Sequence, residues 1–324
     1  MVIGMKKAVK TAAIVFAAMM VLACAGSILM GKYVAEQILY QNKENDTKGN
    51  SIKQLEIWGY NLENFLNKYR GEEFEVTAED GNVVPGTLFK ADISSDKWVV
   101  LVHGAGGDRV STYPLAEEYL ARGYNVIAYD QRGSGDNGDD RVTFGILESM
   151  DVEAVVRYAR KELAAGIVIV HGQSMGAQTA ALYASGVNAG DENVADAVIL
   201  DSPVPGMERF LRLMFGDGPE GAYSMTSNYL IFTGKLYMKA IYHIDFDDGD
   251  TIARVAGDNL PTLVIVSDRD EVCQPEMVME VYHHIAMDNK AVAHADSAHI
   301  EGVIDNPAGY MESVTDFLVQ NGLR

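Results

Sequence analysis

The sequence of 324 residues predicts an α/β fold in which a mostly parallel central sheet is flanked by helices. Strand-like and helix-like segments alternate after residue 89, which is typical of parallel sheets. The pentapeptide Gly172-Gln173-Ser174-Met175-Gly176 stands between an apolar run and a helix-forming stretch, and a candidate acid and a candidate histidine follow it in that order. The roughly 270 residues after the N-terminal segment suit one domain with an insertion.

The N-terminal segment determines the expected compartment. Lys6, Lys7 and Lys10 precede 21 residues without a charge, Thr11 to Gly31, and this length is sufficient to cross a bilayer as a helix. Positive charge before the span predicts that the N-terminus stays inside and the bulk of the chain lies outside. We therefore expect residues 1–31 to form a single-pass anchor in the cell membrane, with the rest on the extracytoplasmic side.

Two other interpretations of this segment also predict export. Ala23-Cys24-Ala25 resembles the small-residue cleavage site of a secretory signal peptide, and Cys24 after Val21-Leu22-Ala23 is compatible with a lipoprotein signal. Ser27-Ile28-Leu29-Met30 stays apolar after either cut, and this favours an uncleaved anchor.

Residues 32–50 form the expected polar linker before a domain of residues 51–324. Apolar side chains from Ile52 to Tyr69 recur at helical spacing and predict one helix that packs on the domain. Alternating segments at 74–77 and 83–89, separated by Asp80-Gly81, predict an antiparallel hairpin.

A glycine-rich loop follows the next predicted strand, Trp98 to Val102. The loop is His103-Gly104-Ala105-Gly106-Gly107, and its backbone can approach a substrate oxygen closely. We expect the Ala105 N–H to be one donor of an oxyanion hole and His103 to stabilise the loop. A phosphate-binding role is disfavoured because the spacing matches neither G-x-G-x-x-G nor a P-loop.

The pentapeptide around Ser174 is a G-x-S-x-G motif in a strand–turn–helix context. Such a turn strains the backbone of the serine, and Gly172 and Gly176 remove the side chains that would clash there. The Ser174 hydroxyl then stands clear of the sheet as a candidate nucleophile. The N–H of Met175, at the start of the helix, is the second candidate oxyanion donor.

A serine nucleophile needs a base and an orienting acid. Asp270 follows the predicted strand Leu263 to Val266 and is the preferred acid, with Asp268 and Asp201 as alternatives. His299 lies in a loop after a short strand that ends near Ala295, and we expect it to be the base. Packing, rim or surface positions are expected for the remaining histidines, His171, His243, His283, His284 and His294.

Residues 204–258 form an insertion between two predicted strands and are rich in Met, Tyr, Phe and Leu. We expect a helical cap that covers the active site, and a substrate with an apolar acyl or aryl group. The acidic run Asp245 to Asp250 fails the EF-hand spacing because position twelve is Ala256. We expect neither a metal nor a cofactor.

A formal net charge of −20 makes nucleic acid an improbable partner and disfavours polyanionic substrates. The two cysteines, Cys24 and Cys273, provide no disulfide framework, and we expect Cys273 to be a small buried side chain.

These motifs resemble those of bacterial α/β-hydrolases of the group called serine-aminopeptidase-like or prolyl-oligopeptidase-like. The resemblance covers the chain from about residue 73 to the C-terminus and rests on residues 100–104, 123–135, 143–151, the serine pentapeptide, the Asp270 turn and Ala298-His299. It implies an α/β-hydrolase fold in a group whose members are commonly membrane-anchored proteins with unassigned substrates. Ser134 and Ser267 depart from its usual histidine and glycine.

The expected function is a serine hydrolase that acts through an acyl-enzyme, with Ser174, His299 and Asp270 as the catalytic triad. Carboxylic esters are the preferred substrates, and a peptidase is the alternative within the same chemistry. A non-catalytic surface binding protein on a hydrolase scaffold is the alternative from another class. The partners expected are a small ester or peptide substrate and the membrane.

Overall fold

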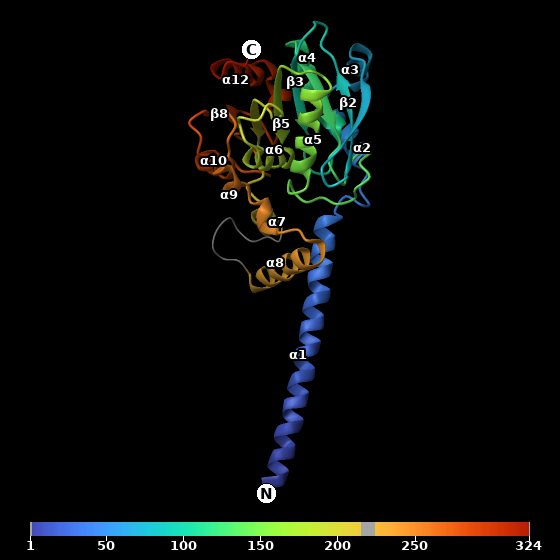
Figure 1. Cartoon of the computed structure of the whole chain (residues 1–324), viewed down its shortest axis with the longest axis vertical. Helices are drawn as coiled ribbons and strands as arrows, with labels where there is room; N and C mark the ends of the chain where they lie inside the picture. The colour runs from blue at the N-terminus through green and yellow to red at the C-terminus, as the bar shows by residue number, and fades with distance from the viewer. Residues whose placement is uncertain (1, 215–223, 324) are drawn as a thin grey trace. The chain divides into compact units, whose positions relative to one another are not determined.

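In this computed structural model, residues 2–214 and 224–323 are described, and the chain divides into two compact units (Figure 1). One unit comprises the residues up to 38 together with the described part of 211–246. The other comprises residues 39–210 and 247–323 and contains the whole sheet. Residues 215–223 of the predicted insertion lie outside the described residues.

The larger unit is built on an eight-stranded sheet with the order β1-β2-β4-β3-β5-β6-β7-β8. Strands from β3 onward pair in parallel, whereas β2 pairs antiparallel with both β1 and β4. The strands are Glu72–Thr77 (β1), Val83–Phe89 (β2), Lys97–Val102 (β3), Asn125–Tyr129 (β4), Ile167–Gln173 (β5), Ala197–Asp201 (β6), Thr262–Ser267 (β7) and Lys290–Ala295 (β8).

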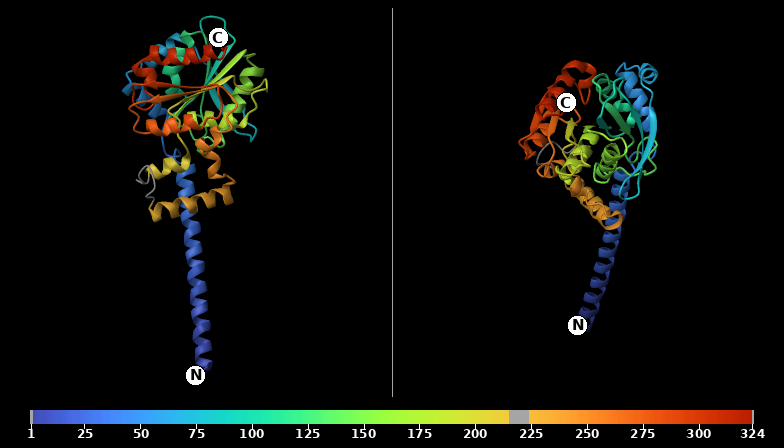
Figure 2. Two further views of the ribbon diagram at one scale, coloured as in Figure 1. Left: turned by 90° about the vertical axis from the view of Figure 1, so that its left-hand side faces the viewer. Right: turned by 45° about the horizontal axis from the view of Figure 1, so that its top comes forward.

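Helices cover both faces of this sheet (Figure 2), with α5, α6 and α10 on one face and α3, α4 and α12 on the other. Every residue of β4, β6 and β7 is buried, as expected for strands covered on both faces. The helices are Thr47–Ile57 (α2), Leu62–Lys68 (α3), Tyr113–Ala121 (α4), Glu148–Lys161 (α5), Met175–Gly186 (α6), Met207–Met214 (α7), Thr251–Val255 (α9), Pro275–His284 (α10), Gly302–Asp305 (α11) and Pro307–Gln320 (α12), with short 3₁₀ helices at Arg109–Thr112 and Phe246–Gly249.

The predicted fold class and the opening hairpin are confirmed. β1 and β2 pair from Thr77↔Val83 to Glu72↔Leu88, and the turn between them contains the predicted Asp80-Gly81. The parallel register sets Val102 beside Gly172 and Gln173 beside Asp201, so the loops after β3, β5 and β6 leave the same edge of the sheet.

The segment before β1 differs from the prediction. α1 (Val2–Leu39) continues through the first part of the expected linker 32–50, and α2 begins at Thr47. The single helix predicted from Ile52 to Tyr69 is two helices, because Gly59 adopts a φ of 68° and the Asn61 side chain caps α3. Glycine tolerates that backbone conformation, and hydrophobic periodicity alone does not reveal it.

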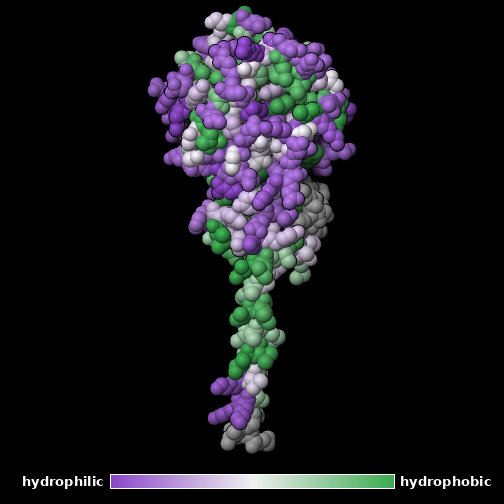
Figure 3. Space-filling model, turned by 90° about the vertical axis from the view of Figure 1, so that its right-hand side faces the viewer, coloured by the Kyte–Doolittle hydropathy of each residue, from purple (hydrophilic) through white to green (hydrophobic). Residues whose placement is uncertain are grey.

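The smaller unit contains α1, α8 (Met225–Tyr237) and a π-helical turn at Met238–Tyr242. Within α1, the segment Met5–Leu39 contains an 18-residue window with a mean hydropathy of 2.4 and is long and apolar enough to cross a membrane, a criterion that a signal sequence also meets. Figure 3 shows hydrophobic side chains along the middle of this helix and hydrophilic ones nearer its N-terminal end. The expected role of residues 204–258 as a cap over the active site stays a prediction.

A buried ion-pair network connects the β1–β2 turn to the layer of α5. The Arg132 side chain has no exposed surface and makes two hydrogen bonds to Asp151, at 2.8 and 2.9 Å, and two to Asp80, at 2.6 and 2.9 Å. The Asp151 side chain is also fully buried. Its carboxylate would therefore lose its main counter-charge if Arg132 were removed.

Replacement of Arg132 by methionine should destabilise the fold by about 3–5 kcal/mol, because Asp151 would be left as an uncompensated buried charge. In Arg157→Met, which breaks the exposed pair with Glu153 on the surface of α5, the loss should stay below about 1 kcal/mol. Urea unfolding of the full chain in detergent measures both values. Equal losses in the two variants would contradict this interpretation.

Candidate active site

Ser174 lies at the sharp turn between β5 and α6. Its φ of 56° and ψ of −119° form a strained conformation for a residue with a side chain. The Ser174 N–H donates to the Asp201 carbonyl at 2.9 Å, and this hydrogen bond ties the turn to the neighbouring strand β6. Backbone strain of this kind is common at functional sites.

The two glycines of the pentapeptide are required by close packing. A Cβ at Gly172 would lie 2.1 Å from the carbonyl oxygen of Gly176. A Cβ at Gly176 would lie 2.0 Å from the carbonyl oxygen of Val102, at the end of β3. Because backbone atoms cannot move aside as a flexible side chain can, α6 reaches this position only without side chains at 172 and 176.

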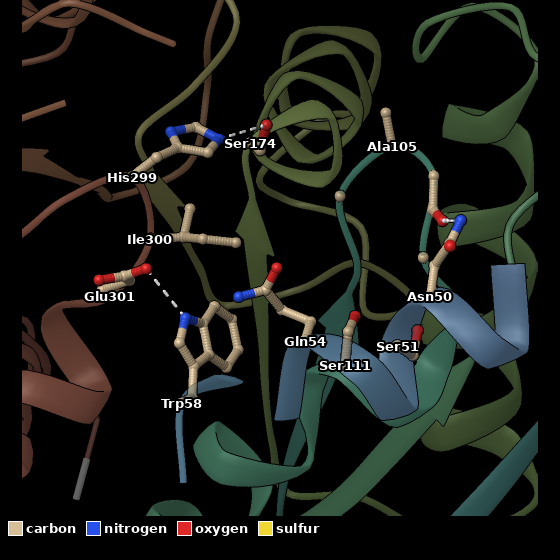
Figure 4. Close-up of a pocket in the computed structure, with 13 residues that line it drawn as sticks. Asn50, Ser51, Gln54, Trp58, Ala105, Ser111, Ser174, His299, Ile300 and Glu301 are labelled. Atoms are coloured by element: carbon tan, nitrogen blue, oxygen red, sulfur yellow. Dashed lines mark hydrogen bonds between the residues drawn. The ribbon is translucent and has the colours of Figure 1, made fainter. Parts of the chain in front are cut away.

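Three predicted residues form one hydrogen-bonded chain. The Ser174 Oγ lies 2.9 Å from His299 Nε2 (Figure 4), and His299 Nδ1 lies 2.6 Å from Asp270 Oδ2. The other carboxylate oxygen of Asp270 accepts the N–H groups of Val272 and Cys273, both at 2.8 Å. The Asp270 side chain is completely buried, so its geometry is determined by these contacts.

Backbone hydrogen bonds past the ends of β7 and β8 bring the acid and the histidine together. The N–H of Asp268 donates to Ala295 at 2.8 Å, and the N–H of Arg269 donates to Ser297 at 2.9 Å. These bonds extend the pairing of β7 and β8 into the two loops. The turn that carries Asp270 is therefore held beside the loop that carries His299.

Neither alternative acid contacts His299 by a hydrogen bond in the described structure. Asp268 bonds His294 at 2.7 Å on an exposed part of the surface. Asp201 is buried and accepts the Tyr310 hydroxyl at 2.8 Å and the Gln173 amide at 3.2 Å. Burial raises the pKa of Asp201 to about 6, and among the described residues its Oδ1 has no hydrogen-bond partner.

His171 belongs to a buried network beside Asp201. Its Nδ1 lies 2.9 Å from the Tyr119 hydroxyl, and its Nε2 lies 3.0 Å from the Tyr310 hydroxyl. Because the Tyr310 proton points to Asp201, the Nε2–H donor tautomer of His171 satisfies the whole chain. Burial lowers the pKa of His171 to about 3, so this histidine is neutral and structural, in agreement with the predicted packing role.

The two candidate oxyanion donors lie near Ser174 in segments that follow different strands, β5 and β3. Met175 is the first residue of α6, where N–H groups have no partner within the helix. Ala105 lies in the loop after β3, and a Cβ at the adjoining Gly104 would lie 3.3 Å from the Ser174 Cβ. His103 is buried and holds this loop, because its Nε2 accepts the Gln131 N–H at 3.0 Å.

A cavity of about 320 Å³ opens beside Ser174 and His299. The loop after β3 forms one side of it, and α2 forms another (Figure 4). Asn50 on α2 donates to the Gly106 carbonyl at 3.0 Å, and Trp58 Nε1, just after α2, donates to Glu301 at 3.0 Å. The segment thus bridges the glycine-rich loop and the histidine loop.

Sequence reasoning missed this wall of the cavity. The sequence predicts that Asn50 belongs to the linker 32–50 and that Gln54 and Trp58 belong to a helix that packs on the domain. The Gln54 side chain points into the cavity between Trp58 and Ile300 (Figure 4). Asn50 precedes the apolar pattern and Gln54 fits its polar side, so no local signal in the sequence marks either residue as part of a cavity.

Comparisons with known proteins identify the fold. Residues 97–226 match the family model described as the alpha/beta hydrolase fold. The esterase Pf2001 of Pyrococcus furiosus has a TM-score of 0.61 at 24% identity, with 81% of this chain and 96% of that one covered. The chain has the α/β-hydrolase fold.

Three other proteins are similar to this chain over different fractions of its length. A puromycin hydrolase has a TM-score of 0.58 at 19% identity over 79% of this chain and 40% of its own. The uncharacterized protein YfhR of Escherichia coli is 23% identical over 78% of this chain and 81% of its own length. The uncharacterized protein YqkD of Bacillus subtilis is 28% identical over 54% of this chain, and that match spans only 56% of YqkD.

Asp201→Asn should remove a pH-dependent loss of stability. Because the pKa of Asp201 is raised in the folded protein to about 6, the folded state holds this proton more tightly than the unfolded chain. The free energy of unfolding therefore falls as the pH rises from about 4 to about 6. Relative to wild type, the variant should gain about 3 kcal/mol between about pH 4 and pH 7. Urea unfolding across this range tests the prediction, and parallel pH profiles would refute it.

Proposed function

We propose that the protein is a serine hydrolase in which Ser174 attacks a carbonyl carbon and forms an acyl-enzyme. His299 Nε2 takes the proton of the serine hydroxyl, and the Asp270 carboxylate orients the imidazole through Nδ1–H. The observation that carries the proposal is the continuous hydrogen-bonded chain from Ser174 to His299 to Asp270.

The proton taken from the serine then passes to the leaving group as the tetrahedral intermediate collapses. His299, protonated by the attack, donates to the departing alcohol, and the acyl group remains on Ser174 Oγ. A water molecule then loses a proton to His299 and attacks the acyl carbon, which releases the carboxylic acid and restores the serine hydroxyl. The buried Asp270 stabilises the imidazolium in both steps.

The N–H groups of Ala105 and Met175 are the proposed donors to the oxyanion. The Met175 N–H carries the positive end of the α6 dipole, which favours negative charge at this position. The parallel pairing of β3 with β5 supports Ala105 as the other donor, because it brings the loop after β3 beside the serine turn. Such donors contribute on the order of 3–4 kcal/mol to the transition state.

Carboxylic esters are the proposed substrates. The cavity volume of about 320 Å³ suits one small acyl or aryl group, and Trp58 and Ile300 supply apolar surface for it. The structural similarity to an esterase supports the same class of bond. Gln54 and Ser111 add polar groups to the lining, so an ester that carries a hydrogen-bonding substituent is favoured over a purely aliphatic one.

A peptidase is the second candidate, and the Glu301 carboxylate favours it. Glu301 lines the cavity and could bind the amino terminus of a peptide by charge, while Trp58 holds one of its oxygens. The structural similarity to a puromycin hydrolase is compatible with this second candidate. A panel of esters and aminoacyl amides, assayed with the full chain, ranks the two candidates by kcat/KM.

We propose further that α1 anchors the protein in a membrane as a single span, with the hydrolase unit on the extracytoplasmic side. The lysines before Thr11 and the uncharged stretch after them support this orientation.

Ser174→Ala should abolish both ester turnover and covalent labelling by a fluorophosphonate, because the attacking oxygen is removed. The thermal midpoint should change little, since the side chain packs little surface. Ser111→Ala is the matched control, because this second hydroxyl lines the same cavity, and it should keep the label. Labelling that survives in Ser174→Ala would remove Ser174 from the mechanism, and an unlabelled wild type would favour the non-catalytic binding protein.

Asp270→Asn should lower kcat by a factor on the order of 10⁴, because asparagine favours the wrong tautomer of His299. Asp268→Asn and Asp201→Asn should keep most of the activity, since neither side chain hydrogen-bonds His299. Steady-state kinetics of the three variants on one ester measures the difference. An inactive Asp268→Asn or Asp201→Asn beside an active Asp270→Asn would move the acid to that residue.

A further inference from the structure

Helix α8 exposes an apolar stripe in the smaller unit. Met225, Tyr229, Phe232 and Leu236 are 90, 45, 63 and 59% exposed, and their spacing of four, three and four residues puts them on one side of the helix. The opposite side carries the buried residues Ser227, Ile231, Gly234 and Met238. A helix at a water-facing surface normally carries polar side chains on its exposed side, whereas the described residues leave much of this apolar stripe uncovered.

The same helix is packed closely on α1. A Cβ at Gly31 would lie 2.5 Å from the Thr233 carbonyl oxygen, and a Cβ at Gly234 would lie 2.6 Å from Val34 Cγ1. The Ser27 and Tyr229 hydroxyl oxygens lie 2.7 Å apart. Small residues at 31 and 234 let the two backbones approach, and α8 crosses α1 at this point (Figures 1 and 2).

The crossing coincides with the end of the uncharged stretch of α1. Thr11 to Gly31 is about 31 Å long as a helix, which matches the hydrocarbon core of a bilayer. Lys32, the next charged residue, pairs with Glu36 one turn later. Residues 27–34, which meet α8, therefore lie at the level where a membrane-spanning α1 leaves the lipid.

The stripe faces the lipid side of this crossing. Tyr229 belongs to the stripe and contacts Ser27, whereas Thr233 and Gly234 contact Gly31 and Val34, further from the N-terminus of α1. Aromatic side chains are favoured at the level of the lipid headgroups, and Tyr229 and Phe232 are of this type.

We propose that α8 is a membrane-surface helix whose stripe of Met225, Tyr229, Phe232 and Leu236 lies in the outer headgroup layer of the bilayer that α1 spans. Burial of four apolar side chains at the boundary between the lipid headgroups and the acyl chains stabilises this arrangement. α1 supplies the span and α8 a second contact with the same leaflet. The inference rests on the proposed span of α1 and is independent of the proposed hydrolase chemistry.

The experiment uses the full chain with Cys24→Ala, reconstituted in vesicles of phosphatidylethanolamine and phosphatidylglycerol. A nitrobenzoxadiazole fluorophore on Phe232→Cys reports the stripe, and the same fluorophore on Ile57→Cys reports an equally apolar exposed position on α2. The Phe232 label should emit at shorter wavelength and be quenched several-fold more strongly by lipids with a nitroxide high on the acyl chain. Aqueous iodide should quench the Ile57 label preferentially.

A second pair of variants tests the crossing itself. Gly31→Leu keeps α1 apolar and helical but inserts a side chain against the Thr233 backbone, so the Phe232 label should lose much of its lipid quenching. Gly26→Leu, at a position with nothing within 4 Å, should leave the quenching unchanged.

Three results would overturn the proposal. Equal iodide quenching of the two labels would put the stripe in water. If the Phe232 label emits at short wavelength but is not quenched by the lipid nitroxide, protein covers the stripe, either a second copy of the chain or the hydrolase unit. Failure of the chain to float with vesicles would remove the span, whereas loss of fluorophosphonate labelling would affect only the hydrolase function.

Discussion

The contact between Gly176 and the end of β3 is the constraint on which the site depends. Without a side chain at 176, the first turn of α6 lies directly against the Val102 carbonyl, and the serine turn therefore lies beside the glycine-rich loop that continues from β3. The strained φ of Ser174 follows from the same packing, because the chain must reverse direction within the reach of two neighbouring strands. Any larger residue at 176 would separate the nucleophile from the loop proposed to receive the oxyanion.

The elements that the sequence predicted well are those with local signals. The β1–β2 hairpin has an alternating pattern and an Asp-Gly turn, and the buried strands β3 to β7 are short apolar runs followed by glycine or polar residues. The break after α2 was missed because its cause is one backbone angle at Gly59, while the apolar spacing continues across it. The hydrogen bond between Trp58 and Glu301 joins residues 243 positions apart and has no local signature at all.

The acid was the open question at the sequence level, and the structure supplies a physical distinction among the three candidates. Asp270 is buried, the N–H groups of Val272 and Cys273 donate to one of its oxygens, and its second oxygen lies against His299. Asp201 is equally buried but has one oxygen without a partner among the described residues, and its raised pKa follows from that burial. Asp268 is exposed and paired with His294. Spacing along the chain does not distinguish Asp270 from Asp201 as the acid, because both lie at the carboxyl ends of buried parallel strands. That Asp270 serves as the catalytic acid stays a prediction.

The family match and the cavity wall coincide only in part. The family match, residues 97–226, contains Ser174, the glycine-rich loop and the strands that hold them. It includes neither α2 nor the loop of Ile300 and Glu301, which supply much of the cavity wall. For the proposed hydrolase, we therefore expect the choice of substrate to depend also on a segment that precedes β1 and on contacts such as Asn50 to Gly106. Because α2 is held at both ends by hydrogen bonds to the two loops of the site, a change in α2 alters the cavity without disturbing the sheet. We therefore expect substitutions in α2 to change the substrate preference of the proposed hydrolase while Ser174, His299 and Asp270 keep their hydrogen bonds.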